Sequence, residues 1–239
     1  MIAILMVLAA PLGGVAAQSN GQAGQGNTGL HVVVTITANP SDDDKDWPII
    51  KVETEKKIDK NTGQVVTWTT ITRRGPTKKI CNNTESVMAT TCTYVDPQSR
   101  SSISSSVGGV VTHITHYADH YCTDGCTWNL YKPTRLEVWW TRPGTSVTVK
   151  DADTKWGCTA ACQLCDGSQY IYYYDSGTFQ PTWLNSTQSY TYVYTTTPSG
   201  PFPPLYAAYL AVISGANTAY VYQGSTNLGS VGTFAAYPS

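Results

Sequence analysis

Short apolar and β-branched stretches recur along the chain, separated by Gly, Pro and Asn. They predict eleven strands, at residues 31–37, 49–56, 65–73, 110–117, 134–142, 146–149, 169–174, 189–196, 205–213, 218–222 and 230–236. Many short strands with turn residues between them are typical of an antiparallel β-sandwich. We therefore expect a mainly β fold with little helix, stapled by disulfides and built as one large or two small sandwiches. A barrel remains an alternative.

Turn and helix signals add detail to this pattern. Asn61-Thr62-Gly63 predicts a hairpin between 49–56 and 65–73, and Pro143-Gly144 predicts a second turn. Helical periodicity is sparse. It predicts only a short helix near Thr159 and a turn over 117–122.

Composition divides the chain into five regions. These are a signal peptide (1–17), a flexible Gly/Gln/Asn-rich tail (18–30), an N-terminal β region (31–100), a Ser/Gly linker or loop (101–109) and a Tyr/Thr-rich C-terminal β domain (110–239). The first β region carries most of the charge. From Trp156 onward there is no Lys or Arg, and only Asp166 and Asp175 are acidic.

The first 17 residues predict export. An apolar run ends in small residues, with Val15 and Ala17 at the −3 and −1 positions of a cleavage site. The alternative is a membrane anchor, which needs about 20 apolar residues. Pro11 and the glycines that follow it interrupt this run early. We therefore expect a secreted or cell-surface protein with no transmembrane span in the mature chain.

The charge balance limits the partners. Net charge is −1 and only 13% of residues are charged, about half the roughly 25% of ordinary soluble domains. Nucleic-acid capture needs a surplus of clustered Lys and Arg. We therefore expect no nucleic-acid partner.

Seven cysteines are consistent with an oxidising compartment. Cys81 and Cys92 are the simplest local pair, and Cys122 and Cys126 are expected to join the group Cys158, Cys162 and Cys165. One of the seven cysteines has no partner left within the chain, so it is either free or disulfide-bonded to another chain. The competing interpretation is zinc, because Cys122-x-x-x-Cys126 and Cys162-x-x-Cys165 approach ligand spacing. The sequons at Asn82 and Asn185 predict surface glycosylation.

Two further groups of residues are candidate metal ligands. His113, His116 and His120 would share a helical stripe, but the apolar residues before them favour a strand, which places His113 and His116 on opposite faces. Asp42, Asp43 and Asp44 could bind calcium, yet the ordered oxygen pattern of a calcium loop is absent. We therefore expect no cofactor, with calcium and zinc as the alternatives.

No nucleophile or phosphate-loop motif occurs in the sequence. Glu137 beside Trp139 superficially suits a glycosidase acid, but no second carboxylate can be paired with it. An enzyme is therefore the less favoured interpretation. A secreted hydrolase with an unrecognised site stays open.

The leading hypothesis is a non-enzymatic structural or adhesive protein, a subunit of an extracellular filament or surface layer that assembles by β-strand addition. Charged edges normally block strand addition, and the C-terminal half lacks them. Val32, Val34 and Ile36 lie in an uncharged strand that could pair within its own sheet or with a neighbour's edge. Expected partners are copies of itself or other surface proteins.

The second hypothesis is a carbohydrate-binding module that uses exposed aromatic rings. Tyr190, Tyr192 and Tyr194 share one strand face, and Trp139 and Trp183 are further candidates for contacts with glycans or proteins. Packing of the same tyrosines across neighbouring strands is the favoured explanation of the pattern, because tyrosine is a common strand residue.

Overall fold

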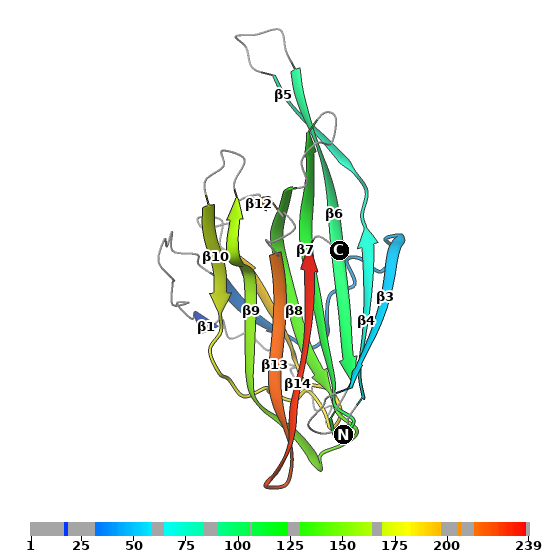
Figure 1. Ribbon diagram of the computed structural model, residues 1–239, viewed down its shortest axis with the longest axis vertical. Helices are drawn as coiled ribbons and strands as arrows, with labels where there is room; N and C mark the ends of the chain where they lie inside the picture. Colours follow the sequence, from blue (N-terminus) through cyan, green and yellow to red (C-terminus); the bar gives the residue numbers. More distant parts are fainter. Residues whose placement is uncertain are drawn as a thin grey trace, which may run out of the picture.

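The described residues form an antiparallel β-sandwich with no helix (Figure 1). The computed structural model describes residues 17–18, 32–58, 65–83, 90–105, 107–123, 130–163, 169–196, 205–206 and 213–237. The expected fold class is confirmed. Among these residues no helix is long and apolar enough to cross a membrane.

Two sheets face each other. The first sheet runs in the order β2 (Val32–Thr37), β11 (Thr191–Thr196), β8 (Leu130–Thr141), β7 (Val111–Thr123), β6 (Thr90–Ser105), β4 (Val65–Arg74) and β3 (Ile49–Ile58). β1 (Ala17–Gln18) pairs with β2, and β5 (Lys78–Asn83) pairs with β6. The second sheet contains β14 (Thr226–Tyr237), β13 (Ile213–Gln223), β9 (Val147–Gln163) and β10 (Gln169–Asp175). β12 (Leu205–Tyr206) pairs with both β8 and β9, and so joins the sheets into one network.

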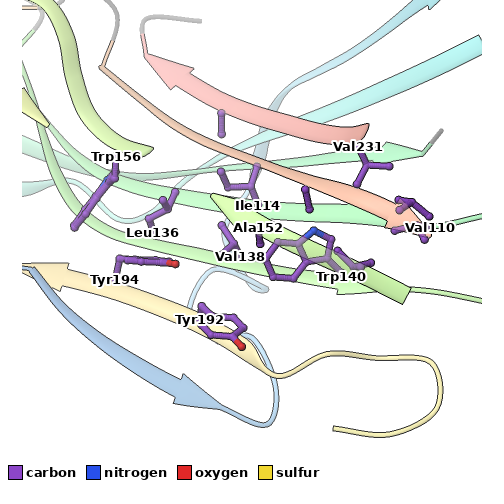
Figure 2. Close-up of a cluster of buried hydrophobic side chains, with 14 of the residues drawn as sticks. Val110, Ile114, Leu136, Val138, Trp140, Ala152, Trp156, Tyr192, Tyr194 and Val231 are labelled. Carbon is purple, nitrogen blue, oxygen red and sulfur yellow. The ribbon is translucent and has the colours of Figure 1, made fainter. Parts of the chain in front are cut away.

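The apolar core lies between the sheets (Figure 2). Leu136, Val138 and Trp140 alternate along β8 and are fully buried, as the two-residue period of a strand requires. Ala152 and Trp156 of β9 are buried in the same cluster, together with residues of β13 and β14. Each large apolar side chain buried here contributes roughly 1.5–3 kcal/mol, which makes this cluster the main source of stability.

The inner face of β6 is polar instead. Gln98, Ser102 and Ser104 are buried there, and Arg100 lies on the same face. Thr233 Oγ1 of β14 donates to Ser102 Oγ at 3.0 Å. Small hydroxyl side chains thus let β14 approach β6, and hydrogen bonds offset the cost of burying them.

Three local expectations are wrong. Ser101–Ser105 do not belong to a linker; they continue β6 and pair with β7 in register. Thr159 lies in β9 rather than in a helix, and residues 117–122 extend β7 rather than forming a turn. In each place, pairing with a neighbouring strand overrides a weak local preference.

The predicted hairpin is confirmed, because β3 and β4 pair over their whole length. The Pro143-Gly144 segment connects β8 of the first sheet to β9 of the second, so it carries the chain across the sandwich. Of the predicted strand at 205–213, the structure describes β12 and the first residue of β13.

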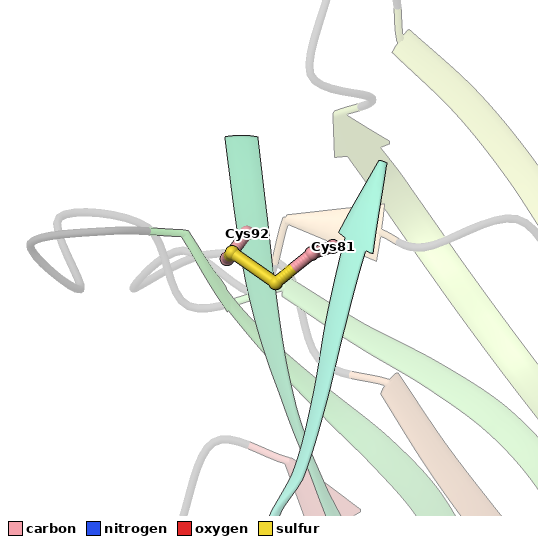
Figure 3. The surroundings of a disulfide bond; sticks show 2 residues. All are labelled: Cys81 and Cys92. Carbon is pink, nitrogen blue, oxygen red and sulfur yellow. A yellow bond between two sulfur atoms is a disulfide. The ribbon is translucent and has the colours of Figure 1, made fainter. Parts of the chain in front are cut away.

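One predicted disulfide is confirmed (Figure 3). Cys81 and Cys92 face each other directly across the β5–β6 pair, with 4.1 Å between their Cα atoms. Cys158 is fully buried and also disulfide-bonded. Cys126 and Cys165, and the side chains of Cys122 and Cys162, lie outside the described residues.

Candidate functional site: an uncharged sheet edge and its crevice

Two rim strands lie on the same side of the sandwich and differ in charge. Among the described residues, β3 pairs with β4 alone, and it carries Lys51, Glu53, Glu55, Lys56 and Lys57. Within the same described residues β14 pairs with β13 alone, and it carries no charged residue over 12 positions. Charges on a rim strand oppose pairing with another chain. The described part of β14 has no such protection.

A crevice separates β14 from the inner face of β3 and β4. β14 packs on β6 and β7, so the two outer strands of the first sheet extend beyond it. The Trp68 side chain of β4 reaches across, and its Nε1 donates to the Gly232 carbonyl of β14 at 3.3 Å. This contact fixes the orientation of the β14 edge toward β4.

Trp68 divides the crevice into two cavities of similar size. One, of about 350 Å³, is lined by Glu53, Thr54, Glu55, Trp68, Thr70, Arg100, Ser102 and Phe234. The other, of about 360 Å³, is lined by Lys57, Ile58, Val66, Trp68, Thr218, Ser230, Val231 and Gly232. The first cavity is ionic and hydroxyl-rich, whereas the second is mostly apolar.

An ion pair lies in the first cavity. Arg100 Nη2 is 2.6 Å from Glu53 Oε2, and Lys51 Nζ is 3.0 Å from the other oxygen of that carboxylate. Burial opposes ionisation of Glu53, but Lys51 and Arg100 outweigh it and hold the Glu53 pKa below its ordinary value. The Arg100 side chain is only 11% exposed. The cavity therefore presents a fixed, charged wall.

β2 is a strand of its own sheet. All six of its residues pair with β11, and β1 lies on its other side at Val33 and Val34. Val32 is buried, and Val34 and Ile36 pack against the core. These three side chains therefore stabilise the protein's own fold. The predicted cleavage site between Ala17 and Gln18 falls inside β1.

A second polar site lies under the loop at residues 39–48. Arg135 Nη1 is 2.7 Å from Asp43 Oδ2, and Arg135 Nε is 3.0 Å from Glu137 Oε1. The Ser41 backbone N–H donates to Glu137 Oε2 at 3.0 Å. The Arg135 guanidinium also lies 3.9 Å from the centroid of the Tyr117 ring. These contacts tie the loop to the outer face of β7 and β8.

The charges of this second site are largely satisfied by one another. Burial raises the pKa of Glu137, against the attraction of Arg135, whereas the hydrogen bond from Arg135 lowers the pKa of Asp43. Asp44 is buried and accepts hydrogen bonds from Ser99 and Tyr117. A cavity of about 330 Å³ borders the cluster, next to Trp47 and Asp119. The ion pairs chiefly hold the loop in place.

The aspartates considered for calcium separate in space. Asp42 is exposed beside Lys45, Asp43 pairs with Arg135, and Asp44 is buried against Ser99. In the part of the chain that the structure describes, no three His, Cys, Asp or Glu residues form a group that could hold a metal ion.

The three candidate histidines also separate. His113 stacks on Trp139 with ring centroids 4.8 Å apart, and His120 stacks on Tyr131. His116 is fully buried between the sheets. Its Nδ1 donates to the Ala235 carbonyl, and its Nε2 accepts from Trp156 Nε1 at 3.1 Å. Desolvation lowers the pKa of both His113 and His116 to about 4. His116 is therefore a neutral core residue with both ring nitrogens engaged.

Two of the five candidate aromatic residues are buried, and the other three are half-buried. Tyr192 and Tyr194 are buried in the core, and Tyr190 is half-buried. Trp183 is half-buried, with the Arg142 guanidinium 3.7 Å from its ring centroid. Packing between strands, which was the favoured explanation, accounts for the two buried tyrosines.

The two sequons lie in different surroundings. Asn185 is exposed in a turn, where its Oδ1 accepts from the backbone N–H groups of Thr187 and Gln188. Asn82 lies in β5, and its side chain is outside the described residues. Comparison with protein-family models, curated proteins and solved structures found no match.

Sequence reasoning missed the crevice residues Trp68 and Arg100. The sequence carried no signal for Arg100, because Ile103, the apolar residue of this run, lies on the strand face opposite to Gln98, Arg100, Ser102 and Ser104. Reading that run as a strand would have placed Ile103 inward and Arg100 outward. In the structure Ile103 is 40% exposed and the Arg100 side chain is 11% exposed.

Proposed function

We propose that this protein is an extracellular structural subunit that assembles with copies of itself by adding a β-strand to the free edge of β14. The observation that carries the proposal is this rim strand of 12 uncharged residues beside a charged rim strand, β3. An unprotected edge offers backbone donors and acceptors to an incoming strand.

The surroundings of the edge support a specific contact. Phe234 is 55% exposed on β14, and the crevice beside the strand offers shaped cavities on either side of Trp68. Backbone pairing supplies affinity in strand addition, and cavities for alternate side chains supply specificity. A contact between two different surfaces leaves each copy with an unused donor strand and an unused edge, so it extends into an open polymer where the rotation between copies does not close a ring.

Lysines placed along the edge test the proposal. In the variant Ser230→Lys with Phe234→Lys, both changes fall on exposed positions of β14. We expect regular polymers of the unaltered protein in negative-stain microscopy and light scattering. The variant needs at least about tenfold more protein to assemble, corresponding to about 1.4 kcal/mol per contact.

Tyr220→Lys is the matched control. Tyr220 is 47% exposed on β13, which has partners on both sides. This control adds a lysine to the same sheet without altering a free edge, so its assembly is unchanged. Monodisperse wild-type particles at every concentration would contradict the proposal, as would equal loss of assembly in the control.

A further inference from the structure

The partner strand can be specified further, and this inference rests on the proposed function. We infer that residues 18–30 of a second copy form the strand that pairs with β14 and lies over the crevice beside Trp68. These residues read Gln-Ser-Asn-Gly-Gln-Ala-Gly-Gln-Gly-Asn-Thr-Gly-Leu, and His31 alone separates them from β2.

The segment matches the edge in charge. Neither residues 18–30 nor β14 contains a charged side chain, so pairing buries no unpaired charge and meets no repulsion. β2 itself is unsuitable as the donor, because it is fully paired with β11 and its apolar side chains serve its own core. Residues 18–30 become available as a strand when the two-residue pairing of β1 with β2, in which Gln18 lies opposite Val33, opens.

The segment also matches the crevice in shape and polarity. In an extended strand, Gln18, Asn20 and Gln22 share one face, and Ser19, Gly21 and Ala23 share the other. The amide row suits the wall of Glu53, Arg100 and Ser102, since amides both donate and accept hydrogen bonds. Glycines at 21, 24 and 26 let a backbone pass close to the Trp68 indole.

Length favours a second copy over the same chain. Thirteen extended residues span about 43 Å, comparable to a strand of the length of β14. In sheet order, β2 and β4 are separated by β11, β8, β7 and β6. Crossing that width at about 4.8 Å per strand uses roughly 24 Å of the segment. Within one molecule, too little chain would remain to cover β14.

A complementation experiment tests the inference. One variant lacks residues 18–30 but keeps β14; the other carries Ser230→Lys with Phe234→Lys but keeps residues 18–30. We expect each variant alone to be monomeric in light scattering. Mixed in equal amounts, they form a dimer of twice the monomer mass, because one supplies the strand and the other supplies the edge.

Hydrogen exchange then locates the contact. In the mixed dimer, the amides of β14 in the truncated partner exchange at least about tenfold more slowly than in its monomer. The amides of the charged rim strand β3 exchange at unchanged rates. Circular dichroism of each variant checks that the sandwich is retained.

The outcomes separate the two proposals. If the wild-type protein polymerises and the β14 lysines abolish this, but the mixed variants stay monomeric, the edge is used and residues 18–30 are not the donor. Monomeric wild-type protein whose truncated form aggregates would show that the segment covers β14 within one chain, which overturns this inference. Wild-type protein that never assembles, with or without residues 18–30, removes the proposed function itself.

Discussion

His116 illustrates how one residue changes meaning between sequence and structure. The sequence places it in a row of three histidines, which suggests a metal site, but the two-residue period of β7 separates it from His113. The separation of His113 and His116 onto opposite strand faces could be predicted from the sequence. The hydrogen bonds from Trp156 and to Ala235 could not, because they come from strands far away in the chain.

The buried histidines make the protein sensitive to acid. His116 has a pKa of about 4 in the fold, against about 6.5 in the unfolded chain. Between these values the unfolded chain binds a proton that the folded chain does not, so the free energy of unfolding falls as the pH falls. The loss is roughly 1.4 kcal/mol per pH unit for one such group, or about 3 kcal/mol in total. Above about pH 6.5 the effect is absent.

The substitution His116→Leu tests whether His116 makes the unfolding free energy fall as the pH falls. At pH 7 the variant is less stable by about 1–3 kcal/mol, because the Trp156 N–H loses its acceptor. Between pH 6.5 and 4 its unfolding free energy, measured in urea, falls less steeply than that of the wild-type protein. His113 still titrates in the variant, so a residual slope remains. An unchanged slope would show that His116 takes up its proton at the same pH in the folded and the unfolded chain.

At the scale of elements, most strands and the antiparallel fold were predictable from apolar alternation. The β3–β4 hairpin followed from its turn residues. Which strands remain unpaired at the rims was not predictable, because pairing depends on contacts between distant segments. β11 and β14 are both uncharged, yet β11 lies between β2 and β8, whereas β14 has one neighbour in the part of the chain that the structure describes.

Packing of β13 against β8 depends on a missing side chain. A Cβ on Gly215 would overlap the Leu136 side chain of the facing sheet. Gly215→Ala therefore costs about 1–3 kcal/mol of unfolding free energy, measured by urea denaturation, because a well-packed core resists added volume.

Gly144→Ala is the control for that substitution. Nothing lies within 4 Å of a Cβ at Gly144, so the change stays within about 0.5 kcal/mol. Similar losses in both variants would indicate a general intolerance of alanine rather than a steric conflict at Leu136.

At the scale of the whole molecule, the two halves of the interior differ. Near β8 and β9 the sheets are joined by hydrocarbon and aromatic side chains, whereas near β6 hydroxyl and ionic groups lie between them. The polar side opens into the crevice next to β14. The part of the fold with the least apolar burial is therefore also the part with the free edge.

The sequence indicated this asymmetry only in outline. Charge is concentrated before Arg100 and is nearly absent after Trp156. In the fold, the charged segment supplies β3 and the uncharged segment supplies β14, and the two meet across Trp68. Nothing in the sequence alone placed these segments side by side, because 164 residues separate Trp68 from Gly232.

The Cys81–Cys92 bond ties together the arm that β5 and the start of β6 form beyond the body of the sandwich (Figure 1). Its position has a consequence for cleavage by a protease. A cut anywhere between residues 83 and 90 falls inside the covalent ring, so the two fragments stay joined. The nicked protein keeps its full mass on a gel and separates into two pieces only after a thiol reductant is added.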